Sequence, residues 1–222
     1  MSKVINASGF TKPSDFKDEN FWENLKNELS AVETRLVVTH RINPYSPNTY
    51  LMAFVSNDII SPSNMLNVIK EPDPSKAKAV ATLLNSALFL VKFFLLKEET
   101  TGRYINIRFY DLYETNLFPK ESLIPNLVKV YEAYCLSEFP SLREQLDKNF
   151  DQRYEEFWKV RRHDQPSLFS VFNNEVEPSE IRLNFDLDIC KALGVETTKD
   201  ELISVYRTIV KEMIITRGLT RD

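Results

Sequence analysis

The hydrophobic pattern of this 222-residue chain changes character near Pro119. Before that residue, short β-branched and aromatic segments are separated by turn residues, and residues 102–112 alternate between apolar and polar side chains. Such alternation is typical of strands with one buried face. After Pro119, apolar residues recur every three to four positions, which is typical of amphipathic helices. The change of period predicts an α+β fold.

We divide the chain at these changes of pattern. Residues 1–34 form a polar lead-in with one predicted helix, residues 35–119 a predicted α+β domain, and residues 120–222 a helical C-terminal region. Within the middle part we expect a small twisted β-unit, with strands at 34–40 and 49–56, backed by one long helix. That helix begins at Ser75, which is a good N-cap. Asn85 and Ser86 interrupt its apolar middle, and we expect them to be structural, capping a neighbouring loop or packing close to the sheet.

Several kinds of chemistry are disfavoured by the composition. Only four glycines occur, so no glycine-rich loop that cradles a nucleotide phosphate can be written. Asp186 and Asp188 are two apart on a predicted helix and cannot face one another, which disfavours a metal site. Cys135 and Cys190 match no zinc spacing. We therefore expect no catalytic residue, no cofactor-binding residue and no metal ligand in this chain.

The expected location is the cytoplasm, away from membranes. The first residues lack the apolar core of a secretory signal. The longest apolar stretch, residues 86–96, is too short to span a bilayer and contains Lys92. Two cysteines without a disulfide framework suit a reducing compartment.

Charge is distributed unevenly along the chain. Residues 35–110 hold nine lysines or arginines against five aspartates or glutamates, a net of +4, whereas the whole chain has a net charge of -4. The β-rich middle is thus the basic part of an acidic protein. A local basic surface of this kind is where a polyanion such as DNA would bind.

Nine side chains in this basic part suit contacts to DNA. Arginine and lysine bind phosphates, while arginine and asparagine also reach base edges. They lie in the proline-stiffened loop at residues 41–48, on or beside the polar face of the strand at 102–112, and in the first turns of the helix from Ser75. Lysines there oppose the helix dipole, which a nearby phosphate would relieve. The predicted DNA-binding residues are Arg41, Asn43, Tyr45, Asn48, Lys76, Lys78, Arg103, Asn106 and Arg108.

Residues 79–119 resemble the segment that closes the target recognition region of adenine-specific DNA methyltransferases of restriction-modification systems. In that family a helix carrying the letters LLNS leads to a Thr-Gly turn, and a strand and a "DL…LP" exit follow. The matching residues here are Leu83, Leu84, Asn85, Ser86, Thr101, Gly102, Asp111, Leu112 and Pro119.

Residues 181–214 resemble the C-terminal helical piece of the same enzymes. There a helix of the form "R…LD…ALG" is followed by one of the form "L…LY…LV". The matching residues here are Arg182, Leu187, Asp188, Ala192, Leu193, Gly194, Leu202, Tyr206 and Val210. The order and spacing of the two stretches add to the specificity of each motif alone.

The resemblance covers roughly residue 35 to the end and lacks the catalytic domain. It implies a sequence-specific DNA target recognition region that is not an enzyme by itself. Its partners would be double-stranded DNA and a methyltransferase catalytic domain in cis or in trans. That domain would bind S-adenosylmethionine and would flip and methylate the adenine, whereas this chain would need no cofactor.

An alternative function stays open on the sequence alone. The aromatic and acidic helices of the C-terminal region suit a protein-interaction module with no nucleic-acid role. The placement of the cations separates the two functions. DNA recognition is favoured if four cations converge on one exposed concave face, namely Arg41, Lys76, Arg103 and Arg108. The interaction module is favoured if they are scattered.

Overall fold

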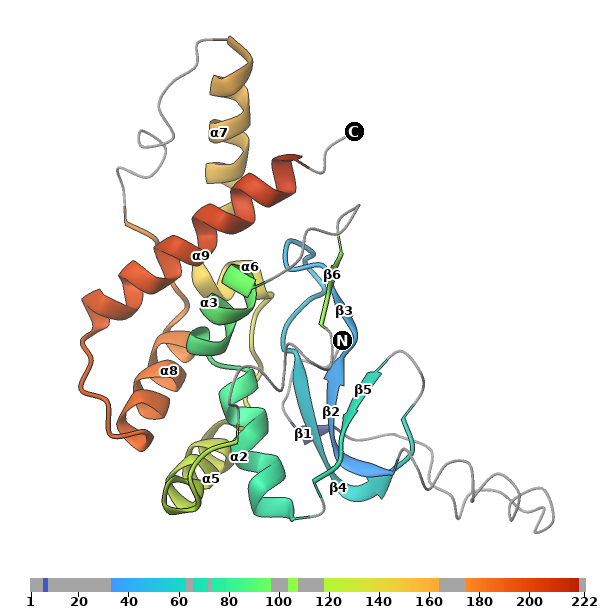
Figure 1. Cartoon of the computed structure of the whole chain (residues 1–222). Helices are drawn as coiled ribbons and strands as arrows, with labels where there is room; N and C mark the ends of the chain where they lie inside the picture. Colours follow the sequence, from blue (N-terminus) through green and yellow to red (C-terminus); the bar gives the residue numbers. More distant parts are fainter. Residues whose placement is uncertain are drawn as a thin grey trace, which may run out of the picture.

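A small sheet lies beside a layer of helices in the computed structural model of the chain (Figure 1). The strands β1 (Asn6–Ala7), β2 (Thr34–Thr39), β4 (Ala53–Ile60) and β5 (Leu66–Ile69) form one sheet in the order β1-β4-β2-β5. The pairing of β1 with β4 is parallel, and the other two pairings are antiparallel. The structure describes residues 6–7, 33–62, 66–71, 73–96, 104–107, 118–163 and 175–219.

The central strand β2 is buried on both faces. Its residues Leu36, Val37 and Val38 are all 0% exposed. A strand covered on both sides reads as a continuous apolar run rather than an alternation, which is the pattern in the sequence. The strand predicted at 34–40 is therefore confirmed in β2.

A second, two-stranded sheet pairs β3 (Arg41–Ile42) with β6 (Ile105–Asn106). Of the strand predicted at 102–112, only β6 and its two neighbours lie within the described residues. The strand predicted at 49–56 instead begins at Ala53. Before Ala53, the Thr49 and Tyr50 carbonyls accept from Leu142 and Gln145 of the helical part, whereas the Met52 carbonyl accepts from the Thr39 backbone N–H of β2 at 2.9 Å.

The long helix predicted from Ser75 is broken in two, so the prediction of one helix was wrong. Its parts are α2 (Pro74–Leu84) and α3 (Ala87–Leu96), which meet at an angle of 61°. The N-cap is Asp73 rather than Ser75, because its carboxylate accepts from the first backbone N–H groups while Pro74 occupies the first turn. The break falls at Asn85 and Ser86.

Asn85 leaves the helix to bind the sheet. Its side-chain oxygen accepts from the backbone N–H groups of Met52 and Ala53 at 2.9 and 3.0 Å, and its side-chain nitrogen donates to the Ala53 carbonyl at 2.8 Å. The Ser86 hydroxyl donates to the Leu83 carbonyl at 2.6 Å. The structural role predicted for both residues is confirmed, and the same bonds explain why the helix does not continue.

The C-terminal half of the chain is helical, as predicted. A 3-10 turn at Glu121–Leu123 leads into the first helix, and four more follow within the described residues of this half. The helices are α5 (Ile124–Tyr134), α6 (Leu142–Leu146), α7 (Phe150–His163), α8 (Glu180–Ala192) and α9 (Lys199–Leu219).

Two helix ends follow the signals in the sequence. Gly194 ends α8 with a φ of 72°, a left-handed conformation that favours glycine. Thr198 precedes α9, and its hydroxyl accepts from the Glu201 backbone N–H at 3.3 Å while the Glu201 carboxylate accepts from the Thr198 backbone N–H at 2.7 Å. This reciprocal pair is a capping box, which the Thr-x-x-Glu spacing in the sequence favours.

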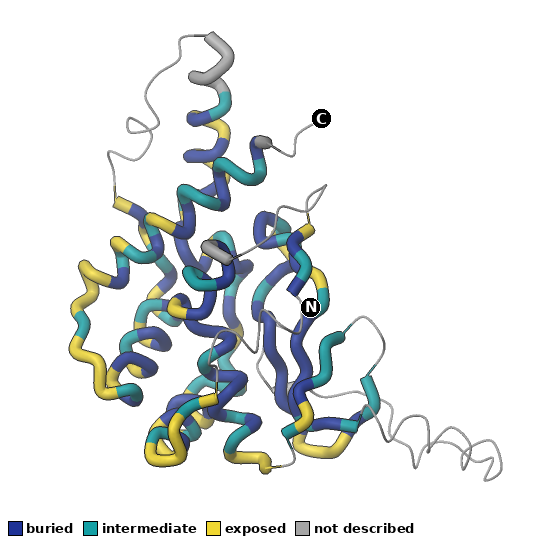
Figure 2. Tube along the Cα trace, in the orientation of Figure 1, coloured by how far each residue is buried: buried dark blue, intermediate teal, exposed yellow. Residues whose placement is uncertain are grey.

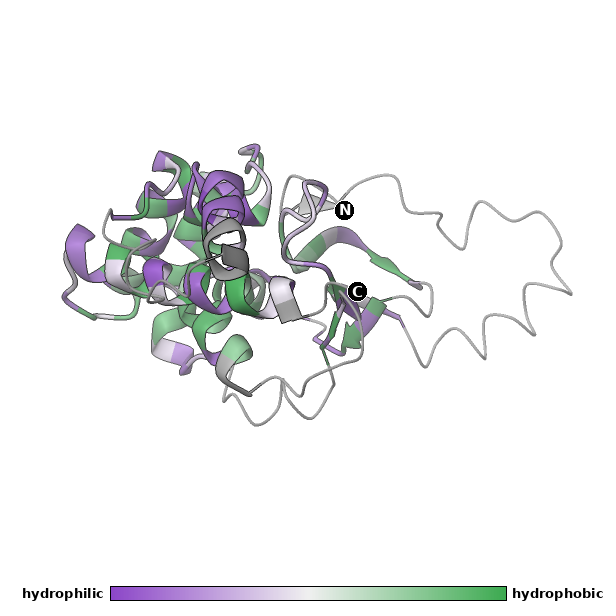
Figure 3. Cartoon of the chain, turned by 90° about the horizontal axis from the view of Figure 1, so that it is seen from above, coloured by the Kyte–Doolittle hydropathy of each residue, from purple (hydrophilic) through white to green (hydrophobic). Residues whose placement is uncertain are grey.

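One hydrophobic core runs through both the sheet and the helices. Figure 2 shows the buried residues as a continuous band through the strands and the inner helices. Figure 3 shows the same arrangement from above, with the helices to one side of the strands. The fold class is α+β with a helical C-terminal region, as predicted.

Candidate nucleic-acid interface

The two-stranded β3–β6 ribbon continues the edge of the main sheet. Strand β2 pairs with β5 along one edge. One residue further on, the His40 carbonyl accepts from the Ile107 backbone N–H at 2.9 Å on that same edge. The Asn67 side chain of β5 donates to the Ile107 carbonyl at 2.7 Å, which joins the ends of β5 and β6. The ribbon is therefore fixed to the sheet at its base.

Arg41 and Asn106 come together on this ribbon. They are directly opposite in the ladder, and the Arg41 Nε donates to the Asn106 side-chain oxygen at 2.8 Å. Arg41 is exposed. Its two terminal guanidinium nitrogens make no hydrogen bond or ion pair with the described part of the chain. The two terminal nitrogens are the ones that bind a phosphate or a guanine edge, and they remain available for a ligand. The bond from Nε to Asn106 fixes the orientation of the guanidinium plane.

The loop that follows β3 holds two further predicted residues. The Asn43 side-chain oxygen accepts from the Tyr45 backbone N–H at 3.2 Å, and the Asn43 carbonyl accepts from the Thr49 hydroxyl at 2.7 Å. Asn48 is exposed, and its backbone N–H donates to the Ser46 hydroxyl at 3.2 Å. These local bonds define two turns, and the first of them begins one residue after the ribbon.

Tyr45 does not present its ring to a ligand in this structure. It is 5% exposed, and burial raises the pKa of its phenol, against which the side chains of Thr216 and Arg217 act. The ring packs beneath the loop, towards the end of α9. A polar-looking loop residue thus serves as an anchor, which the sequence could not indicate because its neighbours Thr216 and Arg217 lie near the other end of the chain.

Lys76 and Lys78 lie elsewhere. Lys76 pairs with Glu121 at 2.5 Å and Lys78 pairs with Glu132 at 3.1 Å. The first pair joins α2 to the 3-10 turn before α5 and the second joins α2 to α5 itself, and Figure 1 places this end of α2 at the far end of the sheet from the ribbon. The expected convergence of Lys76 with Arg41 is not observed. Both glutamates lie more than 40 residues further along the chain, so the sequence of α2 does not reveal these pairs.

Of the nine predicted residues, the structure brings Arg41 and Asn106 into contact on the ribbon. Asn43 and Asn48 lie on the loop that follows β3. Arg103 and Arg108 lie outside the described residues, so their placement stays a prediction.

A buried polar network lies behind this loop and was not identified from the sequence. Arg182 is 0% exposed. Its Nε donates to Asp186 at 2.8 Å, and its Nη1 donates to the Asn85 carbonyl at 2.8 Å and to the Gln145 side-chain oxygen at 3.1 Å. The Tyr206 hydroxyl also donates to Asp186 at 2.8 Å. Such buried charges are stable only when paired and hydrogen-bonded.

The network joins the two stretches on which the family resemblance rests. Asn85 belongs to the first stretch, and Arg182 and Tyr206 belong to the second. Asp186 accepts from the Ala87 backbone N–H at 2.9 Å. Asp188, by contrast, is exposed on the other side of α8 and accepts from the Tyr134 hydroxyl at 2.8 Å. The two aspartates thus diverge, as their spacing predicted.

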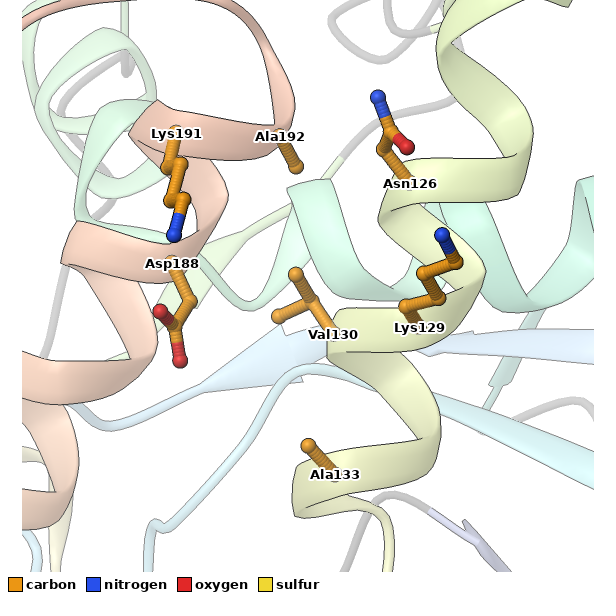
Figure 4. A pocket seen from close by; sticks show the side chains of 7 residues that line it. All are labelled: Asn126, Lys129, Val130, Ala133, Asp188, Lys191 and Ala192. Atoms are coloured by element: carbon orange, nitrogen blue, oxygen red, sulfur yellow. The ribbon is translucent and has the colours of Figure 1, made fainter.

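A separate groove of about 450 Å³ lies between α5 and α8. Figure 4 shows Lys129 and Lys191 on its two walls, with Val130 at the centre of the view. Neither lysine has an ion pair or side-chain hydrogen bond within the described ranges. The remaining lining residues are Asn126, Ala133, Asp188 and Ala192.

Comparison with known proteins finds no matching family model, curated protein or solved structure. Among the described residues, no cluster of three or more histidine, cysteine or carboxylate side chains is placed to hold a metal ion. In that same part of the chain, no single helix has the length and apolar character to cross a membrane. The bent pair of α2 and the first residues of α3 meets these two criteria jointly.

Proposed function

We propose that this chain is the target recognition region of an adenine-specific DNA methyltransferase or a combined restriction-modification enzyme. The observation that carries the proposal is the exposed Arg41 guanidinium, which Asn106 holds in place across the ribbon at 2.8 Å. A fork fixed through one nitrogen loses little conformational entropy when the others bind a ligand. The ribbon belongs to the basic part of the chain, whose net charge is +4 over residues 35–110.

The family resemblance supports the same function. Its two stretches are far apart in the sequence, yet their polar residues Asn85, Arg182 and Tyr206 belong to one buried network. A chance likeness in either stretch alone would not require its residues to meet those of the other. Residues of both stretches therefore belong to one hydrogen-bonded unit of the fold.

In this function the chain grips the duplex and selects the site. The Arg41 fork binds a phosphate or the O6 and N7 atoms of a guanine, and the amides of Asn43 and Asn48 bind backbone or base edges. The methyl donor, S-adenosylmethionine, is bound by a catalytic domain in cis or in trans, which also flips the adenine. The two cysteines are free thiols, which suits a cytoplasmic location.

The test is binding of a mixed-sequence duplex to the full chain across a salt series. Counterion release makes the affinity fall as salt rises, and we expect Arg41→Gln to weaken binding and to reduce the slope of log affinity against log salt by about one if Arg41 contacts a phosphate. If Arg41 reads a guanine instead, the slope changes little and discrimination at one base pair is lost.

Lys76→Gln is the matched control, because it removes the same charge at a position paired with Glu121. We expect it to leave duplex binding unchanged. Equal losses of duplex affinity in Arg41→Gln and Lys76→Gln would contradict the assignment of the ribbon as the DNA-contacting surface. A wild-type chain that binds no duplex at low salt would remove the proposed function.

A second candidate is the protein-interaction module. Two observations favour it. Lys76 and Lys78 are paired with glutamates rather than converging with Arg41, and the groove between α5 and α8 carries two lysines that have no ion-pair partner in the described part of the chain, over an apolar centre. Charge complementarity there suits an acidic segment of a partner protein. The salt series separates the candidates, since this module predicts no salt-dependent duplex binding.

A further inference from the structure

The loop at residues 43–52, which connects β3 to β4, is held by the first turn of α6. Three donors of that turn bind three carbonyls of the loop. The pairs are Leu142 N to Thr49 O at 2.6 Å, Arg143 Nη1 to Tyr45 O at 3.4 Å, and Gln145 Nε2 to Tyr50 O at 2.7 Å. The first N–H groups of a helix have no partner within it, so this contact satisfies both the helix end and the loop.

Gln145 is the most deeply placed of these donors. It is 0% exposed, and its side-chain nitrogen donates to the Tyr50 carbonyl at 2.7 Å and to the Pro140 carbonyl at 2.8 Å. Its side-chain oxygen accepts from Arg182 at 3.1 Å. Both amide hydrogens and the acceptor are therefore in use, which fixes the orientation of the amide.

The same network holds the far end of the loop. Arg182 donates to the Asn85 carbonyl, and the Asn85 side chain binds the backbone of Met52 and Ala53. The loop is thus bound at Tyr50 through Gln145 and at its exit through Asn85. Both attachments lead to the single guanidinium of Arg182.

We propose that Gln145 is a positioning residue that sets the conformation of the 43–52 loop, and with it the placement of Asn43 and Asn48 on that loop. The effect of Gln145 on DNA binding rests on the proposed function. The effect of Gln145 on the loop conformation does not, because it is a property of the chain without DNA. A loop ordered before binding costs less entropy at the moment of binding. The helical region, which contributes none of the predicted DNA-binding residues, thereby determines how the loop meets the duplex.

The test is the replacement Gln145→Met in the full chain, which keeps the volume and removes both donors. The Ser46 and Thr49 backbone N–H groups donate within the loop, so their hydrogen exchange reports its local opening. We expect exchange at these two amides to accelerate by about tenfold relative to the amide of Val37 in β2, because the loop loses a buried anchor. Affinity for the duplex should fall in the same variant.

Tyr206→Phe is the control, because it removes a hydrogen bond to Asp186 from the same network without touching Gln145. We expect it to change loop and core amides by equal factors. Equal factors in Gln145→Met as well would overturn the proposal. If the wild-type chain binds no duplex at low salt, the proposed function fails, and the exchange ratio still decides whether Gln145 positions the loop.

Discussion

The guanidinium of Arg182 and the carboxylate of Asp186 lie one helical turn apart in α8, and each is 1% exposed at the side chain. The pair is hydrogen-bonded to Asn85, Gln145, Ala87 and Tyr206. Isolated buried charges are costly, so the value of the pair depends on these surrounding bonds. At the residue scale, this network is the feature that ties the sheet to the helices.

Arg182→Met should lower the free energy of unfolding by about 3–5 kcal/mol, because it leaves the Asp186 carboxylate buried without its cation. Urea unfolding followed by circular dichroism measures the loss. Lys191→Met, which removes an exposed cation from the same helix, serves as control and should change stability by less than about 0.5 kcal/mol.

The double variant Arg182→Met with Asp186→Leu should be more stable than the sum of the two single losses indicates, because neither charge is left unpaired. A strictly additive double variant would contradict the pairing.

At the scale of the elements, the broken helix and the caps decide the path of the chain. The break between α2 and α3 lets Asn85 bind the sheet, and it turns α3 towards α9. The capping box before α9 is exposed to solvent, and it satisfies backbone groups that the helix itself cannot.

The capping box makes stability depend on pH. The backbone N–H and the hydroxyl of Thr198 donate to the Glu201 carboxylate and hold its pKa below the ordinary value of 4.5. Because the folded-state pKa is the lower one, the stabilisation is fully present above pH 4.5 and is lost as the pH falls through the folded-state pKa. We expect the difference in melting temperature between wild type and Glu201→Gln to shrink over that window.

Thermal unfolding of the two proteins at neutral pH and at successively lower pH checks this. Glu196→Gln is the matched control, since Glu196 lies outside the helix, and among the described residues the carboxylate bonded to Thr198 is that of Glu201. A difference between wild type and Glu201→Gln that stays constant down to low pH would show that the carboxylate charge is irrelevant to the cap.

At the scale of the whole molecule, one core joins the β-unit to the helical region. Buried residues of β2, α2, α5, α8 and α9 belong to the same cluster, and α2 packs directly on α5. The hydrophobic pattern changes its period at residue 119, but the hydrophobic core includes residues from both sides of that boundary.

A chain with a shared core should unfold in one transition. In the variant Trp22→Phe, fluorescence reports Trp158 of α7, whereas far-ultraviolet circular dichroism reports the backbone of all elements. We expect the urea midpoints from the two probes to coincide. Separate midpoints would show that the helical region and the β-unit are independently stable.

Much of the local structure could be predicted because its causes are local. The apolar run of β2, the glycine after α8 and the capping box of α9 each depend on neighbours within a few residues. The break at Asn85 was missed because the groups it binds, on Met52 and Ala53, lie more than 30 residues away. Gln145 was missed for the same reason, since its partners are carbonyls of a loop and an arginine on α8.

The sequence by itself determined the α+β class, the basic character of the middle region and the positions of most helices and strands. Periodicity, net charge and capping chemistry are short-range properties that survive without tertiary contacts. Only the tertiary structure decided which cations stay available. Arg41 is exposed beside Asn106, whereas Lys76 and Lys78 pair with glutamates of α5 and of the turn before it, because pairing depends on which distant elements the core brings side by side.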